Sequence, residues 1–455
     1  MRKKTQKQMP LMITGIDHQH ARELEGINKI LDDNPTITEL VWQDLTCACN
    51  LTENPSGANG MTAEQVIRAA VIKKMEEFSY EDLAFHLLDS VSYRSFCRIG
   101  FADKGFQKSA LCHNIKSITP ETWEAINRIL TSYGVNKKIE KGRETRIDCT
   151  VVASNIHDPS DSSLLWDCVR VLSRELFKIN ENFEVHVNFT NHTKRAKRRM
   201  LGVMNAKNKK ARKNQYQDLL VVTKKTVNYA ETAVSLLETS SFKLHSQVVS
   251  AQSLAEELRQ LIELTEKVIN QTVRRIINGE SVPATEKVVS IFEPHTDIIV
   301  KDRRETYYGH KVCLSGGASN LITDCLIVEG NPPDTSLSTQ MLDRHKEIYG
   351  RYPLKVAFDG GFASKKNLES AKNKKIKDVC FAKKRGLKVE DMCRSEYVYK
   401  RLRRFRAGIE SGISWIKRCF GFSRCTWKSF SSFKSYVWAS IVSANLLTIA
   451  RKQMV

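Results

Sequence analysis

The sequence feature that most constrains the fold is a change of hydrophobic period at residue 145. Before it, residues 61–134 carry apolar side chains at helical spacing, whereas residues 146–153 alternate and are rich in β-branched side chains, which predicts a strand. Strand patterns return only at Thr296, after the helical residues 160–280. This order of a strand, a long helical stretch and further strands excludes a plain helical bundle and an all-β protein. We therefore predict an α/β domain with a helical insertion.

The predicted strand places an acid between apolar neighbours. Ile147, Cys149 and Val151 fall on one face, and the other face carries Asp148 together with Thr150 and Val152.

The region before the strand predicts an all-α domain at residues 61–140, preceded by an N-terminal arm at residues 1–60. Thr62 and Gln65 form a capping box, and the Thr119-Pro120 pair gives an N-cap followed by proline at the first helical position. Leu83, Leu87 and Leu88 are expected on one face of the helix between them. Short helices with tight turns suit a DNA-binding helix-turn-helix unit and a plain bundle equally well.

The later part of the chain, 145–455, is predicted as one catalytic domain interrupted at about residues 165–285. Near-heptad leucines in the insertion, such as Leu254 and Leu258, indicate a long helical hairpin or short coiled coil. The remaining elements are expected as strands at 298–300, 309–314, 322–328, 354–358 and 379–382, and as helices at 336–349, 402–420 and 433–451. The pair at 309–314 and 322–328 predicts an antiparallel hairpin turned by Gly316-Gly317.

Charge indicates the partner. The chain has 72 Lys and Arg against 51 Asp and Glu, a net charge of +21, which favours nucleic acid over a membrane surface. No acid lies between Lys194 and Lys213, so we expect phosphate contacts from a basic run rather than a merely solvated face. Its first members are Lys194, Arg195, Lys197, Arg198 and Arg199. A second basic stretch, from Lys383 to Arg404, lies just before Glu410 and could guide DNA.

The cysteines and the apolar segments indicate a cytoplasmic protein. The twelve cysteines form no C-x-x-C pair, and Cys47 and Cys49 have no second half nearby for a zinc site. The basic start lacks the apolar core of a signal peptide, and Val437 to Ala450 is too short to span a bilayer. We therefore expect reduced thiols, no export and no membrane partner.

Acids occur where chemistry could use them. Asp359 stands where a predicted strand stops at two glycines, a position that points into the crevice of an open α/β sheet but that also suits an ordinary turn. Farther on, Arg406, Glu410 and Lys417 share one helix face opposite Phe405, Ile409, Ile413 and Ile416. Carboxylates on three separate elements suit phosphodiester chemistry with two Mg²⁺ ions. Arg406 and Lys417, near the acid, are expected to bind DNA by holding the phosphates of the scissile strand. Composition alone does not select Asp148, Asp359 and Glu410 from 51 acids.

Five segments in order resemble the insertion-sequence transposases of bacteria that belong to the DDE class. They are RIDCTVV at 146–152, HDPSDSSLL at 157–165, YGHKV at 308–312, AFDGGF at 357–362 and RFRAGIESGISWIK at 404–417. The resemblance extends from Met61 to Arg451 and includes FSYEDL at 78–83 and YRSFCR at 93–98. It implies a ribonuclease-H-like mixed-sheet core in which Asp148, Asp359 and Glu410 are the catalytic, metal-binding acids.

The third-acid segment resembles the family signature Tyr-x2-Arg-x3-Glu-x6-Lys. Arg406, Glu410 and Lys417 fit it, whereas Arg403 stands at the tyrosine position. This departure removes whatever the tyrosine contributes and leaves the metal ligands intact. The resemblance further implies Mg²⁺, which Mn²⁺ can replace, element ends and target DNA as partners, a homodimer or larger synaptic complex, and a nucleoid-associated enzyme.

Several alternatives remain open. His310 and Lys311 could contact DNA, although a strand histidine is often only a hydrogen-bonded core residue. Asp158, Asp161 and Ser162 are expected to cap the entry to the insertion rather than to act in catalysis. The whole chain could also be a metal-dependent nuclease of the same fold, or a catalytically silent DNA-binding protein.

Overall fold

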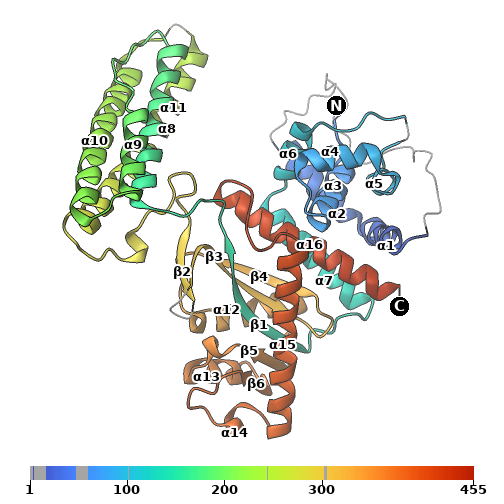
Figure 1. The fold of residues 1–455 in the computed structure, drawn as a ribbon. Helices are drawn as coiled ribbons and strands as arrows, with labels where there is room; N and C mark the ends of the chain where they lie inside the picture. Colours follow the sequence, from blue (N-terminus) through green and yellow to red (C-terminus); the bar gives the residue numbers. More distant parts are fainter. Residues whose placement is uncertain are drawn as a thin grey trace. The chain divides into compact units, whose positions relative to one another are not determined.

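The computed structural model describes residues 4, 17–47, 60–100, 102–242, 244–301 and 305–454. The chain divides into two compact units. Unit 1 comprises Met1–Ala153 and His310–Val455, and unit 2 comprises Ser154–Gly309 (Figure 1). The chain thus leaves unit 1 after its first strand and returns to it later, as the change of period predicts.

The N-terminal part of unit 1 is helical, and its helices begin where the caps predict. Its helices are α1 (Gln19–Asp33), α2 (Pro35–Thr46), α3 (Ala63–Met75), α4 (Tyr80–Asp89), α5 (Val91–Phe96), α6 (Lys108–Lys116) and α7 (Pro120–Asn136). Thr62 caps α3 in a capping box with Gln65, and Thr119 caps α7 with proline in its first turn. Leu83 and Leu87 are buried as expected, but Leu88 is exposed. The buried face of α4 is narrower than predicted and does not include Leu88.

Part of the segment expected as an arm is ordered helix. α1 and α2 bury Ile27, Ile30 and Val41 in the same core as the later helices. The rest of that arm, residues 1–3, 5–16 and 48–59, lies outside the described residues, and so does Cys49.

The C-terminal helix completes the N-terminal core. α16 (Phe430–Gln453) contacts α1, α3 and α7, and nearly all of its residues from Phe433 to Ala450 are buried (Figure 1). Its Asn445 side-chain amide donates to Asn127 Oδ1 at 2.7 Å and to the Ile322 carbonyl at 2.8 Å, which ties the helix to α7 and to the sheet. No described helix is long and apolar enough to cross a membrane.

A mixed sheet forms the other part of unit 1. Its strands are β1 (Glu144–Ala153), β3 (Glu305–Gly316), β4 (Ile322–Val328), β5 (Lys355–Phe358) and β6 (Asp378–Phe381). They run in the order β3-β1-β5-β6, with β4 antiparallel on β3 as the predicted hairpin, and β1-β5 and β5-β6 parallel. The helices between and after these strands are α12 (Ser338–Tyr349), α13 (Lys365–Asn373), α14 (Val389–Met392) and α15 (Glu396–Cys419).

Unit 2 is a helical bundle followed by a strand pair. It holds α8 (Asp161–Asn182), α9 (Thr193–Met204), α10 (Lys209–Thr239) and α11 (His245–Thr272), then β2 (Asp297–Lys301), which pairs with the first residues of β3. The predicted long helical hairpin or short coiled coil corresponds to α10 and α11, which pack on each other within a larger bundle, because α10 also packs on α8 and α9. Leu258 and Val268 are buried in this bundle, where they contribute to two neighbouring clusters.

Candidate active site

The backbone of the sheet brings the predicted acids together in unit 1. β1 pairs in parallel with β5 in a register that sets Ile147 opposite Phe358, so Asp148 and Asp359 follow at the same level. The backbone N–H of Asp359 donates to the Ile147 carbonyl at 3.3 Å, which extends the ladder by one residue. Glu410 comes from α15, which contacts both β1 and β5. Three elements that are far apart in the chain therefore supply one cluster.

The two glycines after Asp359 are required by their surroundings. Asp359 caps a short 3-10 turn, Gly360–Phe362, and its Oδ2 accepts from the Gly361 N–H at 3.3 Å. A Cβ on Gly361 would lie 2.5 Å from Asp334 Oδ2, and one on Gly360 would lie 2.8 Å from the Lys383 side chain. The AFDGGF segment thus combines a strand end, an acid and a turn too crowded for larger residues.

Arg406 lies at the centre of the acids. Its Nη1 is 2.7 Å from Asp359 Oδ1 and 3.6 Å from Asp148 Oδ2, and its Nη2 donates to Glu410 Oε1, one helical turn farther along α15. The Arg406 and Asp148 side chains are only 13% and 14% exposed, whereas Asp359 and Glu410 are 38% and 56% exposed. One guanidinium therefore contacts all three carboxylates, and the cluster opens to solvent on the side of Asp359 and Glu410.

The cluster carries more negative than positive charge, and the deepest acid shows the effect. Burial, together with the neighbouring charge of Asp359, raises the pKa of Asp148 to about 7, against the opposing effect of Arg406. Burial lowers the pKa of Arg406, but its hydrogen bond to Glu410 and the charge of Asp359 outweigh that effect and raise it. Asp148 thus sits where a further cation would be favoured.

The donor set fits a hard divalent cation. Asp148, Asp359 and Glu410 offer only carboxylate oxygens, the ligands that Mg²⁺ prefers. Among the described residues, no group of three His, Cys, Asp or Glu side chains is already arranged to hold a metal ion. The three acids are instead joined through the Arg406 guanidinium.

Sequence reasoning missed a residue that positions α15. Arg146 on β1 donates from Nη1 to the Phe405 carbonyl at 3.0 Å and from Nη2 to Asn320 Oδ1 at 2.6 Å, and its guanidinium lies 4.9 Å from the Phe405 ring centroid. A Cβ on Gly408 would lie 1.8 Å from Arg146 Nη1, so only glycine leaves room for this contact. The sequence offered only an arginine two residues before Asp148 and a glycine two residues before Glu410 as signals.

The predicted apolar face of α15 is confirmed. In the part of the chain that the structure describes, no neighbouring tyrosine takes the place of the family's tyrosine, where this chain has Arg403. Ile409, Ile413 and Ile416 are buried. Arg403, at the family's tyrosine position, is exposed, while the nearby Tyr399 is buried and donates its hydroxyl to the Phe381 carbonyl at 3.0 Å.

Two predicted DNA contacts on β3 are engaged inside the protein. His310 is 1% exposed and lies near the rings of Phe430 and Phe433, with centroids 4.7 and 4.9 Å away, so of the two roles left open by the sequence the structure favours the core residue over the DNA contact. Lys311 Nζ is 2.9 Å from Asp334 Oδ1 and donates to the Pro332 carbonyl at 2.6 Å. The charge of Lys311, which was predicted to contact DNA, is thus paired with Asp334 inside the protein.

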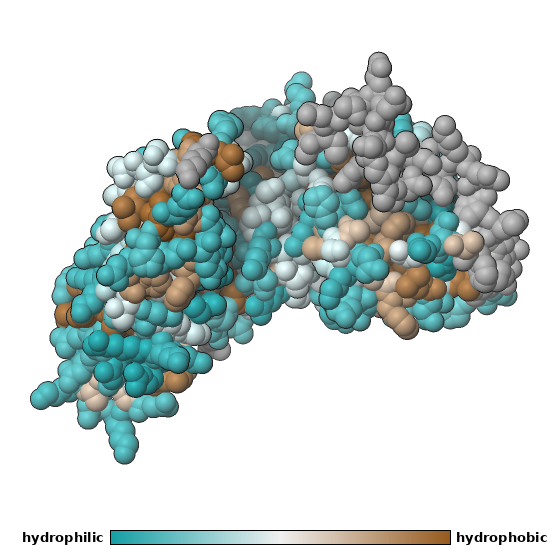
Figure 2. All heavy atoms as spheres, turned by 90° about the horizontal axis from the view of Figure 1, so that it is seen from above, coloured by the Kyte–Doolittle hydropathy of each residue, from teal (hydrophilic) through white to brown (hydrophobic). Residues whose placement is uncertain are grey.

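The basic run begins on α9 and ends at the start of α10 in unit 2. Ion pairs neutralise some of its charges. Lys194, Lys197 and Arg198 are exposed, whereas Arg195 and Arg199 both pair with Asp218 of α10. The sequence does not reveal these ion pairs, because Asp218 follows the basic run in the chain and contacts it only when α9 and α10 pack together. The face of unit 2 that is visible in Figure 2 carries mostly hydrophilic side chains, with hydrophobic ones scattered among them.

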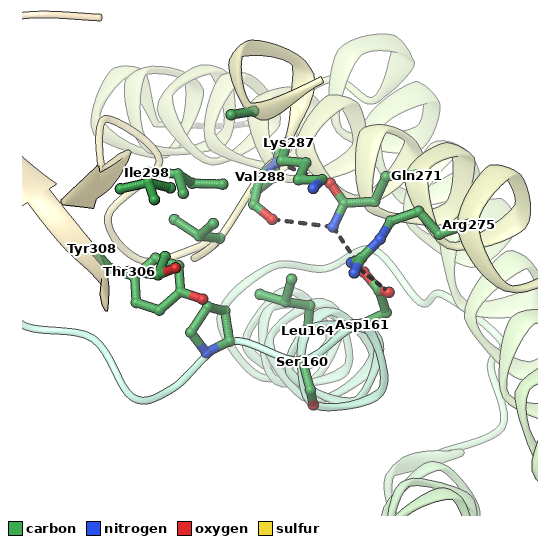
Figure 3. A pocket seen from close by; sticks show the side chains of 14 residues that line it. Ser160, Asp161, Leu164, Gln271, Arg275, Lys287, Val288, Ile298, Thr306 and Tyr308 are labelled. Carbon is green, nitrogen blue, oxygen red and sulfur yellow. Dashed lines mark hydrogen bonds and ion pairs between the residues drawn. The ribbon is translucent and has the colours of Figure 1, made fainter. Parts of the chain in front are cut away.

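A pocket of about 330 Å³ lies inside unit 2, between the start of α8, the end of α11 and the β2-β3 pair (Figure 3). Asp161 is 5% exposed there. It accepts from Arg275 Nη1 at 2.8 and 2.9 Å and from Gln271 at 3.2 Å. Leu164, Val288, Ile298 and Tyr308 supply apolar walls. Asp161 is thus paired in the first turn of α8, whereas Ser160 caps this helix, so the capping expected of Asp161 was wrong.

The mixed sheet has parallel strands β1, β5 and β6, and α15 packs against it, which is consistent with a ribonuclease-H-like fold. Residues 270–446 match the family described as the transposase DDE domain, and this match supports the predicted DDE transposase. The match includes Asp359 and Glu410, whereas Asp148 precedes it. Searches of curated proteins and of solved structures found no match.

Proposed function

We propose that the protein is an insertion-sequence transposase that cleaves DNA strands at the ends of its element and joins the freed 3′-hydroxyl to target DNA. The observation that carries this proposal is the convergence of Asp148, Asp359 and Glu410 on a single guanidinium. A domain of the transposase DDE family supplies the reaction class. The net charge of +21 supports a polyanionic substrate.

Asp148, Asp359 and Glu410 would hold Mg²⁺, which Mn²⁺ can replace. The bound ions would activate the attacking oxygen and stabilise the leaving oxygen of the phosphodiester. The protein's own contribution is the placement of the acids: Asp148 is fixed by the sheet, Asp359 by its turn, and Glu410 by α15 packed through Arg146. Such fixed placement lowers the cost of arranging ligands during the reaction.

Basic side chains would hold the DNA phosphates. Lys417 is seven residues after Glu410 on the same helix, about 10 Å along its axis. On unit 2, the exposed Lys194, Lys197 and Arg198 form no ion pair with another described residue, so their charge would be available to the phosphates. Contacts of this kind position a duplex without reading its sequence. We assign base recognition to the helical residues 61–140, where α4 and α6 lie against each other.

Joining two ends in one event requires two active sites to act together, so the proposal includes a homodimer or larger synaptic complex. The protein would then act on DNA in the bacterial nucleoid. A nuclease of the same fold would cut the same ends without joining them, and a silent DNA-binding protein would bind them without cutting.

The test is incubation of the purified protein with labelled duplex carrying the inverted repeats that flank its gene, with and without Mg²⁺. We expect nicking at the repeat boundary and, with added target plasmid, joined products. Asp359→Asn should abolish both products, whereas Asp391→Asn, an exposed acid on α14, should leave them unchanged. Cleavage without joining would favour the nuclease, and binding without cleavage in either protein would contradict the proposed enzyme.

A further inference from the structure

The two aspartates of the site divide their oxygens between the backbone and Arg406. Asp148 Oδ1 accepts from the Cys149 N–H at 2.8 Å, and Asp359 Oδ2 accepts from the Gly361 N–H at 3.3 Å. The other oxygen of each, Asp148 Oδ2 and Asp359 Oδ1, faces Arg406 Nη1. The oxygens that the backbone leaves open for a cation are therefore the ones that the guanidinium contacts.

A guanidinium and a divalent cation cannot use these oxygens together. Arg406 has only donors and a permanent positive charge, so it has nothing to offer a metal ion and repels it. Its side chain is 13% exposed, and Nη1 is committed to two acids while Nη2 is committed to Glu410. A cation that binds Asp148 and Asp359 must therefore move the guanidinium out of the cluster.

We propose that Arg406 is an internal counter-ion of the three acids, which holds the metal-free site together and is displaced when a divalent cation binds. This inference rests on the proposed function, because it assumes that the acids bind the metal. It replaces the sequence prediction that Arg406 binds DNA in the free protein. Arg406 becomes available to a phosphate only after displacement, so metal binding and DNA contact are coupled through one side chain.

Displacement makes the apparent metal affinity depend on Arg406. If the guanidinium occupies the cluster in nine of ten molecules, the apparent dissociation constant is about tenfold weaker than that of the open site. Removing the guanidinium should then tighten metal binding by about tenfold. The same change should lower the stability of the metal-free protein toward unfolding, because three acids lose the positive charge that they share.

The experiment measures Mn²⁺ binding to the full-length protein by electron paramagnetic resonance without DNA, and counts only the signal that Asp359→Asn removes. The variants are Arg406→Gln, Arg406→Lys and the matched control Arg404→Gln, which removes an exposed arginine from the same helix. We expect about tenfold tighter binding in Arg406→Gln, a smaller gain in Arg406→Lys, and no change in Arg404→Gln. Thermal unfolding in EDTA should show Arg406→Gln melting lower by a few degrees, with the loss recovered on adding Mn²⁺.

The outcomes separate the inference from the proposed function. Equal or weaker Mn²⁺ binding in Arg406→Gln, with normal binding in the wild type, would overturn the counter-ion role and leave the metal site standing. No Asp359-dependent Mn²⁺ signal in the wild type would overturn the metal site and the displacement together. If Arg406→Gln does not fold, Arg406→Lys decides the question by the same comparison, because it retains a charge that cannot span three carboxylates.

Discussion

Two clusters in this molecule each combine a buried aspartate with an arginine, and they differ in their charge balance. In unit 2, the buried Asp161 carboxylate pairs with Arg275, whose side chain is 40% exposed, and accepts a hydrogen bond from Gln271. In unit 1, Arg406 is shared by Asp148, Asp359 and Glu410, so the cluster keeps an excess of negative charge. The Asp161–Arg275 pair is balanced within the fold, whereas an excess of like charge is typical of a site that binds a further cation.

The largest difference should appear when each cluster loses one charge. Glu410→Gln is expected to reduce Mg²⁺-dependent cleavage at least about 100-fold while the fold stays intact, because the amide is a poorer ligand for the metal. Asp161→Asn should leave the cleavage rate per folded molecule near that of the wild type. Rates on labelled end duplex, normalised to folded protein by circular dichroism, measure this. Equal losses in both variants would break the comparison.

The excess charge should also make stability depend on pH through Asp148. The folded pKa of about 7 lies above the ordinary 3.8, so the folded protein holds a proton that the unfolded chain has lost. Stability from this group is present at low pH and falls as the pH rises to about 7, by at most about 4 kcal/mol. Asp148→Asn should remove this fall.

Urea unfolding in EDTA at pH 5 and pH 8 measures the effect, with the exposed Asp391→Asn as the control. The prediction fails if the wild type and Asp148→Asn lose the same stability between these two pH values. Asp148 would then ionise freely in the folded state.

Packing around the acid site can be tested at two glycines of α15. Ala at a helix interior normally stabilises by up to about 1 kcal/mol. At Gly408 the new Cβ would meet Arg146 Nη1 at 1.8 Å, so Gly408→Ala should destabilise by about 1–3 kcal/mol and slow cleavage. At Gly412 the nearest atom, Ile322 Cδ1, is 3.8 Å away, so Gly412→Ala should stabilise. Chemical denaturation of both variants gives the sign, and two stabilised variants would contradict the role of Arg146.

The balanced cluster should respond moderately. Asp161→Asn removes the charge opposite Arg275, which solvent partly screens, so a loss of about 1–2 kcal/mol is expected. Arg275→Gln should cost at least as much, because it leaves the buried carboxylate with Gln271 alone. Thermal unfolding of the two single variants and the double variant measures their coupling. Additive effects would show that the pair is not the stabilising contact.

The smallest effect is expected on the basic face of α9. Replacing Lys197 and Arg198 together by Gln should weaken DNA binding a few-fold and lower the slope of log affinity against log salt by about 1–2. Lys267→Gln on α11, an exposed lysine already paired with Glu263, is the control. Titrations at several salt concentrations measure the slope, and an unchanged slope would place the DNA elsewhere.

The sequence allowed local elements and acids to be predicted better than the contacts between them. Alternation at 146–153, the caps at Thr62 and Thr119 and the strand end at Asp359 are local, and the structure shows each of them. His310, Asp218 and Arg146 depend on neighbours far away in the chain, and no local pattern reveals whether a polar side chain meets an aromatic ring, an acid or DNA. The central place of Arg406 was missed for the same reason, although its spacing from Glu410 was recognised.

The packing of α16 has a consequence for the order in which the protein matures. Residues 430–453 fill the core of helices formed by residues 19–136, and they also anchor the sheet through Asn445. A nascent chain therefore keeps its N-terminal helices incomplete until this last helix has been synthesised. Messages truncated before it would yield neither a stable helical region nor a finished sheet, so premature fragments should be substrates for proteolysis rather than partial enzymes.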